Sequence, residues 1–292
     1  MNEDLNFINS FPKSVPGQEQ PKQPGIEAIM NPKPIFDNPN YKASGKLMNK
    51  VSLITGGDSG IGRAVAIAFA KEGADISIVY FDEDAKETQT IIESLGRKCL
   101  LISGDITDDN FCIDAINQTI NTFNKLDILV NNAAVQYIQN SIEDITKEQL
   151  EKTFKTNIFS MFYLVKAALP HLNRGTSIIN TTSITAYKGN EILIDYSSSK
   201  GAIVSFTRSL ALSLWNKGIR VNAVAPGPIW TPLIPSSFDT NYVETFGSKT
   251  TMGRPGQPVE LAPTYVYLAS NESSSFVSGE VIHINGGEII NG

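Results

Sequence analysis

The stretch "TGGDSGIGRA" (residues 55–64) follows a short β-branched run, "VSLIT" (51–55), and opens an amphipathic segment. Glycines at positions 56, 60 and 62 permit a tight turn and let backbone N–H groups approach a ligand closely. A helix that begins in this turn adds positive potential at its N-terminus, which favours phosphate groups. The stretch therefore predicts a strand, a turn and a helix that bind a pyrophosphate. A glycine-rich turn without a ligand is the alternative.

The same stretch does not fit a phosphate-transfer loop. Such a loop needs Lys and then Ser or Thr after its last glycine, and Arg63 and Ala64 stand there instead. The glycine spacing is T-G-x-x-x-G-x-G rather than the common G-x-G-x-x-G. The stretch is therefore a poor match to a phosphate-transfer loop, and its spacing also differs from the usual dinucleotide pattern.

From residue 46 to residue 292 short apolar runs alternate with longer amphipathic segments, which is typical of βαβ units. The predicted strands are 51–55, 75–80, 98–103, 127–132, 176–182, 219–226 and 280–285. The predicted helices are 60–73, 84–96, 108–124, 147–173, 195–217 and 258–269. Seven nearly continuous apolar strands imply a mostly parallel sheet that is covered on both faces. We expect one α/β domain with a Rossmann-like, doubly wound, seven-stranded parallel sheet.

Residues 1–45 differ in composition from the rest of the chain. They contain 7 of its 15 prolines, which disfavours regular helices and strands, with Gln, Asn and Lys between them. We interpret them as an extended, Pro-rich N-terminal arm. A disordered tail and an ordered arm that lies over the domain or over a neighbouring subunit remain alternatives, because apolar residues such as Phe11 and Met30 could anchor the arm.

The overall composition excludes several classes of protein. A net charge of −6 argues against a nucleic-acid partner. Two cysteines and two histidines are too few for a disulfide scaffold or a convincing metal site, and they favour a reducing compartment. We find no apolar run of the roughly 18 residues that a membrane span needs, and the first residues do not resemble a secretory signal. We therefore predict a cytoplasmic protein without a metal or a membrane partner.

The segment "YSSSK" places Tyr196 and Lys200 at positions i and i+4 of a predicted helix, so both side chains lie on one helix face. This helix follows the fifth strand, and an open α/β sheet binds its ligands at the carboxyl ends of its strands. A free phenol has a pKa near 10, which is too high for efficient proton exchange at neutral pH. A neighbouring ammonium would lower the pKa of the phenol. The pair is therefore either an acid/base device or two surface residues.

Together these features resemble the classical short-chain dehydrogenase/reductase family over about residues 48–290. Further stretches match the family pattern in order: "NNAA" (131–134), "KTNIFS" (155–160), Ser183, Tyr196 with Lys200, and "APGPIWTP" (225–232). The combination is highly specific, although each piece alone is modest. The family usually has Gly where Ala134 stands, a mild departure that we expect to leave cofactor binding intact.

The resemblance implies an NAD(P)-dependent oxidoreductase that interconverts a secondary alcohol with its ketone or aldehyde. In that interpretation Tyr196 exchanges a proton with the substrate oxygen and Ser183 hydrogen-bonds the same oxygen. Lys200, together with the positive ring of the oxidised cofactor, lowers the pKa of Tyr196 and also binds the nicotinamide ribose. Asn157 holds a water that connects Lys200 to solvent. The alternative is a non-catalytic dinucleotide sensor or scaffold, since a fold alone does not establish chemistry.

The resemblance also implies which residues contact the cofactor. They are Gly56, Asp58, Ser59, Gly60, Ile61, Gly62, Tyr80, Asp82, Asp105, Ile106, Asn132, Ala133, Ala134, Tyr196, Lys200, Pro226, Gly227, Ile229 and Thr231. Neither family rule for cofactor choice is met, because Tyr80 is not acidic and Ser59 is not basic. Asp82 and Glu83 would repel the 2′-phosphate of NADP, so we favour NAD over NADP.

The long segment 228–253 resembles the family's substrate loop, and loops of this length usually cover a binding site. Its residues and their neighbours suggest a mainly apolar pocket for a small molecule; the candidates are Trp230, Leu233, Ile234, Tyr137, Ile184 and Ile194. Segments 147–173 and 195–217 carry apolar residues on more than one face, which favours burial against a second subunit. The resemblance implies a homotetramer, with a dimer as the alternative.

Overall fold

The computed structural model describes residues 3–81 and 85–290, and its strands form one parallel sheet in the order β3-β2-β1-β4-β5-β6-β7. The strands are β1 (Val51–Thr55), β2 (Asp75–Tyr80), β3 (Cys99–Ser103), β4 (Ile128–Asn131), β5 (Ser177–Thr181), β6 (Arg220–Pro226) and β7 (Val281–Ile284). Each lies within one residue of its predicted range at either end. The order reverses between β1 and β4, so the predicted doubly wound sheet is confirmed.

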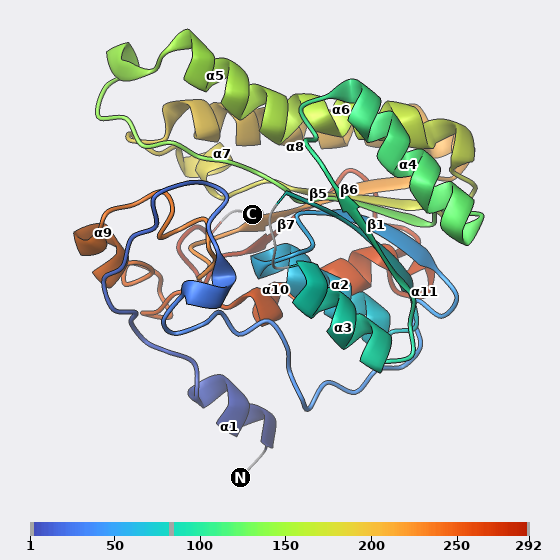
Figure 1. Ribbon diagram of the computed structural model, residues 1–292, viewed down its shortest axis with the longest axis horizontal. Coiled ribbons are helices and arrows are strands. Elements are labelled where there is room, and N and C mark those ends of the chain that lie inside the picture. The colour runs from blue at the N-terminus through green and yellow to red at the C-terminus, as the bar shows by residue number, and fades with distance from the viewer. Residues whose placement is uncertain (1–2, 82–84, 291–292) are drawn as a thin grey trace.

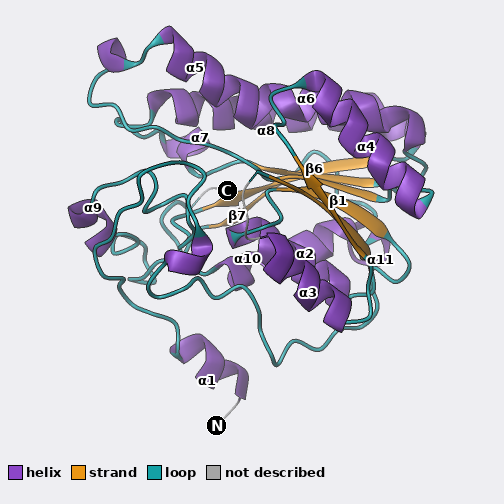
Figure 2. Cartoon of the chain, viewed as in Figure 1, coloured by secondary structure: helices purple, strands orange, loops and turns teal. Residues whose placement is uncertain are grey.

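Helices cover both faces of the sheet (Figures 1 and 2). One layer holds α2 (Gly60–Lys71), α3 (Ala85–Ser94), α10 (Pro258–Ala269) and α11 (Asn271–Ser274), and the other holds α4 (Asp109–Phe123), α5 (Lys147–Phe154), α6 (Ser160–Ala168) and α8 (Ile194–Leu214). The short helices α1 (Glu3–Asn9), α7 (Thr185–Lys188) and α9 (Thr240–Glu244) lie outside these layers. The layers explain why the strands are apolar on both sides.

Side chains of successive strand residues pack into two separate apolar cores. In β1 the side chain of Leu53 packs into the core that includes α4, α6 and α8, whereas Ile54 packs into the core that includes α2 and α10. Side chains of a strand alternate between the two faces of a sheet, and here both faces are covered. Both residues are fully buried as a result.

The chain is helical from Lys147 to His171, close to the predicted range 147–173, but it is not a regular α-helix throughout. Between α5 and α6 the chain forms a π-helical turn at Lys155–Phe159, and after α6 it ends in a 3-10 turn at Leu169–His171. A π turn widens the helix by one residue and often marks a functional site. This turn carries Asn157 at its centre.

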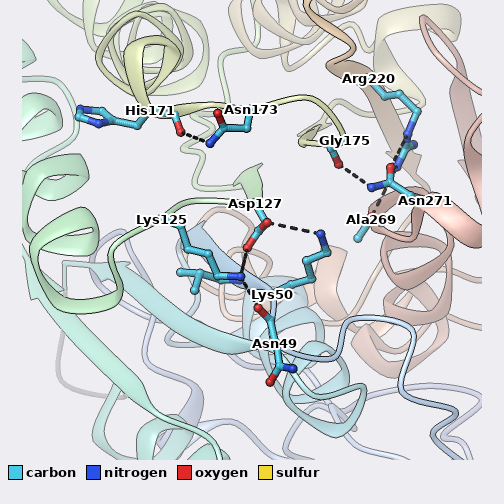
Figure 3. A network of polar contacts seen from close by, with 11 residues as sticks. Asn49, Lys50, Lys125, Asp127, His171, Asn173, Gly175, Arg220, Ala269 and Asn271 are labelled. Carbon is cyan, nitrogen blue, oxygen red and sulfur yellow. Dashed lines mark hydrogen bonds and ion pairs between the residues drawn. The ribbon is translucent and has the colours of Figure 1, made fainter.

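A polar network holds the amino ends of the strands, at the edge opposite to the expected ligand site (Figure 3). Asp127, just before β4, forms ion pairs with Lys50 at 3.4 Å and with Lys125 at 3.1 Å. At the start of β6 the Arg220 guanidinium donates to Asn271 Oδ1 at 3.1 Å. These contacts tie the amino ends of β1, β4 and β6 to neighbouring segments.

The N-terminal arm lies on the domain of its own chain, beside the segment that leads to α9 (Figure 1). The indole N–H of Trp230 donates to the carbonyl of Pro32 at 2.8 Å, and the N–H of Val259 donates to the carbonyl of Ile35 at 3.0 Å. Val15 and Met30 are buried in one apolar cluster with Trp230. The arm is thus packed through side chains as well as through backbone hydrogen bonds.

Within the described residues, no helix has both the length and the apolar character required to cross a membrane. Nor does that part of the chain gather three or more His, Cys, Asp or Glu side chains as a metal ion would need. Cys99 and Cys112 are both free thiols.

Candidate active site

A cavity of about 690 Å³ lies at the carboxyl ends of the strands. The turns that follow β1, β2, β3, β4, β5 and β6 all contribute to its walls. It therefore includes the point between β1 and β4 where the strand order reverses, which is where open α/β sheets bind their ligands.

The glycine turn after β1 forms one wall of this cavity. Gly56 and Gly60 have positive φ angles of 64° and 50°, which only glycine adopts readily. A Cβ on Gly62 would lie 1.8 Å from the carbonyl oxygen of Gly56, so this glycine allows α2 to pack against the turn. Gly62 itself does not line the cavity, and its contact with the cofactor stays a prediction.

The remaining described residues of the predicted cofactor set all line the cavity. They are Gly56, Asp58, Ser59, Gly60, Ile61, Tyr80, Asp105, Ile106, Asn132, Ala133, Ala134, Tyr196, Lys200, Pro226, Gly227, Ile229 and Thr231. Asp82 lies outside the described residues. The sheet order places Tyr80 and Asp105 on one side of the glycine turn and Tyr196 on the other. This spread suits an extended dinucleotide with its phosphates at the turn.

Side chains tie the neighbouring strand ends together at the floor of the cavity. The N–H of Asn132 donates to Thr55 Oγ1 at 2.9 Å, and the Asn132 amide donates to the Thr55 carbonyl at 3.1 Å. Thr181 Oγ1, at the end of β5, donates to Asn132 Oδ1 at 3.3 Å and lies 2.7 Å from the hydroxyl of Tyr265. The ends of β1, β4 and β5 are therefore held in one fixed arrangement.

Tyr196 and Lys200 lie on the inner face of α8, where both are buried. The Tyr196 phenol is hydrogen-bonded to Ser183, which follows β5. Lys200 Nζ donates to the carbonyl of Thr181 at 2.9 Å and lies 5.5 Å from the centre of the Tyr196 ring. The Thr182 hydroxyl donates to the carbonyl of Lys200 at 2.7 Å and fixes α8 on the strand end. The structure thus brings Tyr196, Lys200 and Ser183 together at the cavity.

Burial dominates the electrostatics of this pair. Burial raises the pKa of Tyr196 to about 12, and the hydrogen bond from Ser183 offsets only part of this effect. Burial also lowers the pKa of Lys200 to about 7. The prediction that Lys200 and the oxidised cofactor together lower the pKa of Tyr196 stays a prediction, because the positive nicotinamide ring would act against the effect of burial.

Asn157 is fully buried and does not line the cavity. Its Oδ1 accepts the N–H of Val135 at 2.9 Å, and its Nδ2 donates to the Val135 carbonyl at 2.9 Å and to Ser199 Oγ at 3.0 Å. Val135 lines the cavity, and Ser199 lies beside Lys200 in α8. Asn157 therefore links the wall after β4 to α8. Its role in holding a water stays a prediction.

Replacement of Asn157 by Ala should lower the free energy of unfolding by about 2–4 kcal/mol, because the Val135 N–H and carbonyl lose their partners inside the protein. Urea unfolding measures this loss, and Asn121→Ala, at an exposed position of α4, serves as the control. A loss of activity with an unchanged free energy of unfolding would instead support the water-holding role alone.

The structure places some of the residues predicted to line a substrate pocket at the cavity and others away from it. Tyr137, Ile184, Leu233 and Ile234 line the cavity. Trp230 and Ile194 do not line it, and Trp230 is instead fully buried beneath the arm.

Several residues that line the cavity are not among those predicted from the sequence. Gln23, Pro24 and Gly25 come from the arm, and Gln136 and Asn190 add polar groups to the predicted apolar pocket. Nothing in the local pattern around these residues indicates a site, because their position depends on contacts with distant segments.

Comparison with known proteins identifies relatives over nearly the whole chain. Residues 56–288 match the family model described as enoyl-(acyl carrier protein) reductase. An uncharacterized oxidoreductase of Bacillus subtilis is 62% identical over 98% of this chain and all of its own length. Two plant proteins are also similar. The NADPH-dependent aldehyde reductase 1 of Arabidopsis thaliana is 50% identical over 94% of this chain and 98% of its own length. The glucose and ribitol dehydrogenase of Daucus carota is 51% identical over 95% of this chain and 98% of its own length.

Solved structures show the same fold. A short-chain dehydrogenase from Burkholderia cenocepacia, in complex with NADP, matches with a TM-score of 0.78 and 31% identity. The match covers 83% of this chain and 99% of that one.

Proposed function

The chain belongs to the short-chain dehydrogenase/reductase family and is an NAD(P)-dependent oxidoreductase that acts on CH–OH groups, and we propose that its substrates are small polyhydroxylated alcohols and their aldehydes or ketones. The observation that carries this proposal is the composition of the cavity around Tyr196. Gln136 and Asn190 line it together with the Tyr196 and Ser183 hydroxyls. Such polar groups match a substrate with several hydroxyl groups better than a wholly apolar one.

The names of the relatives agree with this substrate class. The Daucus carota relative is a glucose and ribitol dehydrogenase, and the Arabidopsis thaliana relative is an aldehyde reductase. Both share about half of their residues with this chain over nearly its whole length.

In the oxidative direction, we propose that the Tyr196 phenolate takes the proton of the substrate hydroxyl while the carbon that bears it loses a hydride. In the reductive direction the phenol returns that proton to the carbonyl oxygen. Ser183 hydrogen-bonds the same oxygen and stabilises the charge that develops there. When bound, the nicotinamide cofactor accepts or donates the hydride and, in its oxidised form, adds a positive charge that favours the phenolate.

The residues of the cavity walls support a proposed set of cofactor contacts. The Gly60 N–H donates to the carboxylate of Glu27 at 2.6 Å and is therefore engaged within the protein. We propose that the backbone N–H groups of Ser59 and Ile61, on either side of it, hold the pyrophosphate. Lys200 would hold the nicotinamide ribose. At the adenosine end the described lining residues Ser59, Tyr80 and Phe81 carry no positive charge, which supports our proposal of a preference for NAD.

We also propose a homotetramer in the cytoplasm. Phe159 and Phe162 expose 41% and 53% of their surface on the outer side of the π turn and α6, as expected of a face that packs on another subunit. The two free thiols suit a reducing compartment.

We expect wild-type protein to bind NADH and NADPH and to turn over ribitol or glucose with the oxidised cofactor, measured by absorbance of the reduced form. The NADH complex should be the tighter one, by fluorescence titration. A ketoacyl thioester should be a poor substrate in the same assay. Binding without turnover of any polyol, sugar, aldehyde or thioester would favour the non-catalytic sensor instead.

A further inference from the structure

Residues 20–26 of the arm form a closed loop, here called the roof loop. The side chain of Gln20 closes its neck, because Oε1 accepts the N–H of Ile26 at 2.6 Å and Nε2 donates to the carbonyl of Ile26 at 2.9 Å. Gln20 is only 8% exposed. The loop is thus held by its own side chain, independently of what its tip touches.

The tip of the roof loop lines the cavity through Gln23, Pro24 and Gly25. On one side, the Gln23 amide forms two hydrogen bonds with the backbone of Gln136: Oε1 accepts its N–H at 3.0 Å, and Nε2 donates to its carbonyl. Gln136 lies two residues after Ala134 of the predicted cofactor set. This side is therefore fastened to the wall that follows β4.

The other side of the roof loop lies against segment 228–253, the predicted substrate loop, here called the substrate segment. A Cβ on Gly25 would stand 2.3 Å from the carbonyl oxygen of Pro232, so the two backbones are in close contact. The N–H of Gln20 donates to the carbonyl of Pro235 at 2.6 Å. Pro232 directly follows Thr231, another predicted cofactor residue. The loop thus spans two walls of the cavity.

Directly after the roof loop, Glu27 reaches the third wall. Its carboxylate accepts the Gly60 N–H at 2.6 Å and pairs with Arg63 at 2.8 Å, and its side chain is 1% exposed. The arm therefore contacts the glycine turn, the wall after β4 and the substrate segment, which are three of the chain segments that line the cofactor site.

We propose that the roof loop is a gate over the dinucleotide cleft and that Gln23 is the residue that holds it shut. This inference rests on the nucleotide site of the proposed function. The cofactor enters and leaves only when the loop releases Gln136. The arm stays docked during this motion because its anchors lie outside the loop, in the buried Val15 and Met30 and in the bond between Trp230 and Pro32. The two hydrogen bonds of Gln23 join neutral groups, so thermal motion breaks them readily.

The test compares full-length wild type with Gln23→Ala, which frees the tip, and Gln20→Ala, which opens the neck. Stopped-flow fluorescence with NADH and NADPH gives the association and dissociation rate constants separately. Both constants should rise about tenfold in each variant, as expected for the loss of two hydrogen bonds of ordinary strength. The dissociation constant should change less than either rate, because opening speeds entry and exit alike.

Gln18→Ala is the matched control. Gln18 lies in the same arm and also pairs its amide with a backbone, that of Asn31, but it does not line the cavity. Its rate constants should equal those of wild type. Unchanged rate constants for cofactor binding in Gln23→Ala and Gln20→Ala would overturn the gate. A rise in the dissociation rate constant alone would also overturn it, because that result would mean only that the cofactor had lost a contact. Failure of wild type to bind either reduced cofactor would overturn the proposed function as well.

Discussion

Tyr196→Phe is expected to reduce kcat/KM by a factor of about 10³ or more while the dissociation constants of NADH and NADPH stay within about twofold, since a positioned acid or base contributes about 10²–10⁴. The substitution removes only the hydroxyl that is hydrogen-bonded to Ser183. The ring remains in the apolar cluster that includes Leu193 and Trp230, so the fold should be retained. Steady-state kinetics with ribitol and fluorescence titration of the cofactor measure the two effects.

Tyr187→Phe is the control for this experiment. Tyr187 lies in α7, four residues after Ser183, and does not line the cavity. Its replacement should leave kcat/KM close to that of wild type. If Tyr196→Phe kept near-normal turnover, another group would have to move the proton, and the assignment of Tyr196 would be wrong.

The second large effect concerns Lys200, whose replacement by Met should abolish most turnover and yet stabilise the protein. Burial lowers the pKa of this lysine to about 7, which means that the fold carries a poorly solvated ammonium below that pH. Met fills similar space without a charge. The free energy of unfolding at pH 6 should therefore rise by about 1–4 kcal/mol, as when other buried charges are replaced by apolar groups. Such a conflict between stability and activity is common at active sites.

The pH dependence distinguishes this explanation from ordinary repacking. Between the folded pKa of about 7 and the unfolded value of 10.5, the unfolded chain binds more protons than the folded chain. The free energy of unfolding of wild type therefore rises with pH in this window, as the cost of burying a charged Lys200 disappears. The gain in free energy of unfolding of Lys200→Met over wild type should be largest below pH 7 and should decrease towards pH 10.5. Urea unfolding at several pH values measures it.

Lys86→Met, at an exposed position of α3, should change stability little at any pH. A loss of stability in Lys200→Met at pH 6 would show that the contacts of the ammonium with the Thr181 carbonyl and the Tyr196 ring outweigh its burial.

Much of the architecture follows from local sequence. The strands match their predicted ranges because buried parallel strands are short, continuous apolar runs that any window of the chain reveals. Gly56 and Gly60 were recognised as turn residues because their conformations exclude other side chains. The spacing of Tyr196 and Lys200 predicts a shared helix face through helix geometry alone, and the structure places both at the cavity.

What only the tertiary structure decides depends on distant segments. Trp230 was predicted to line the substrate pocket, but contacts with Pro32 and Met30, some two hundred residues away, bury it under the arm. The pKa of Tyr196 is raised because desolvation sums over every element packed around the phenol, which no spacing along the chain encodes. The arm carries no strand or helix pattern at Gln23, so its place over the cleft emerges only when the walls that it joins have been assembled.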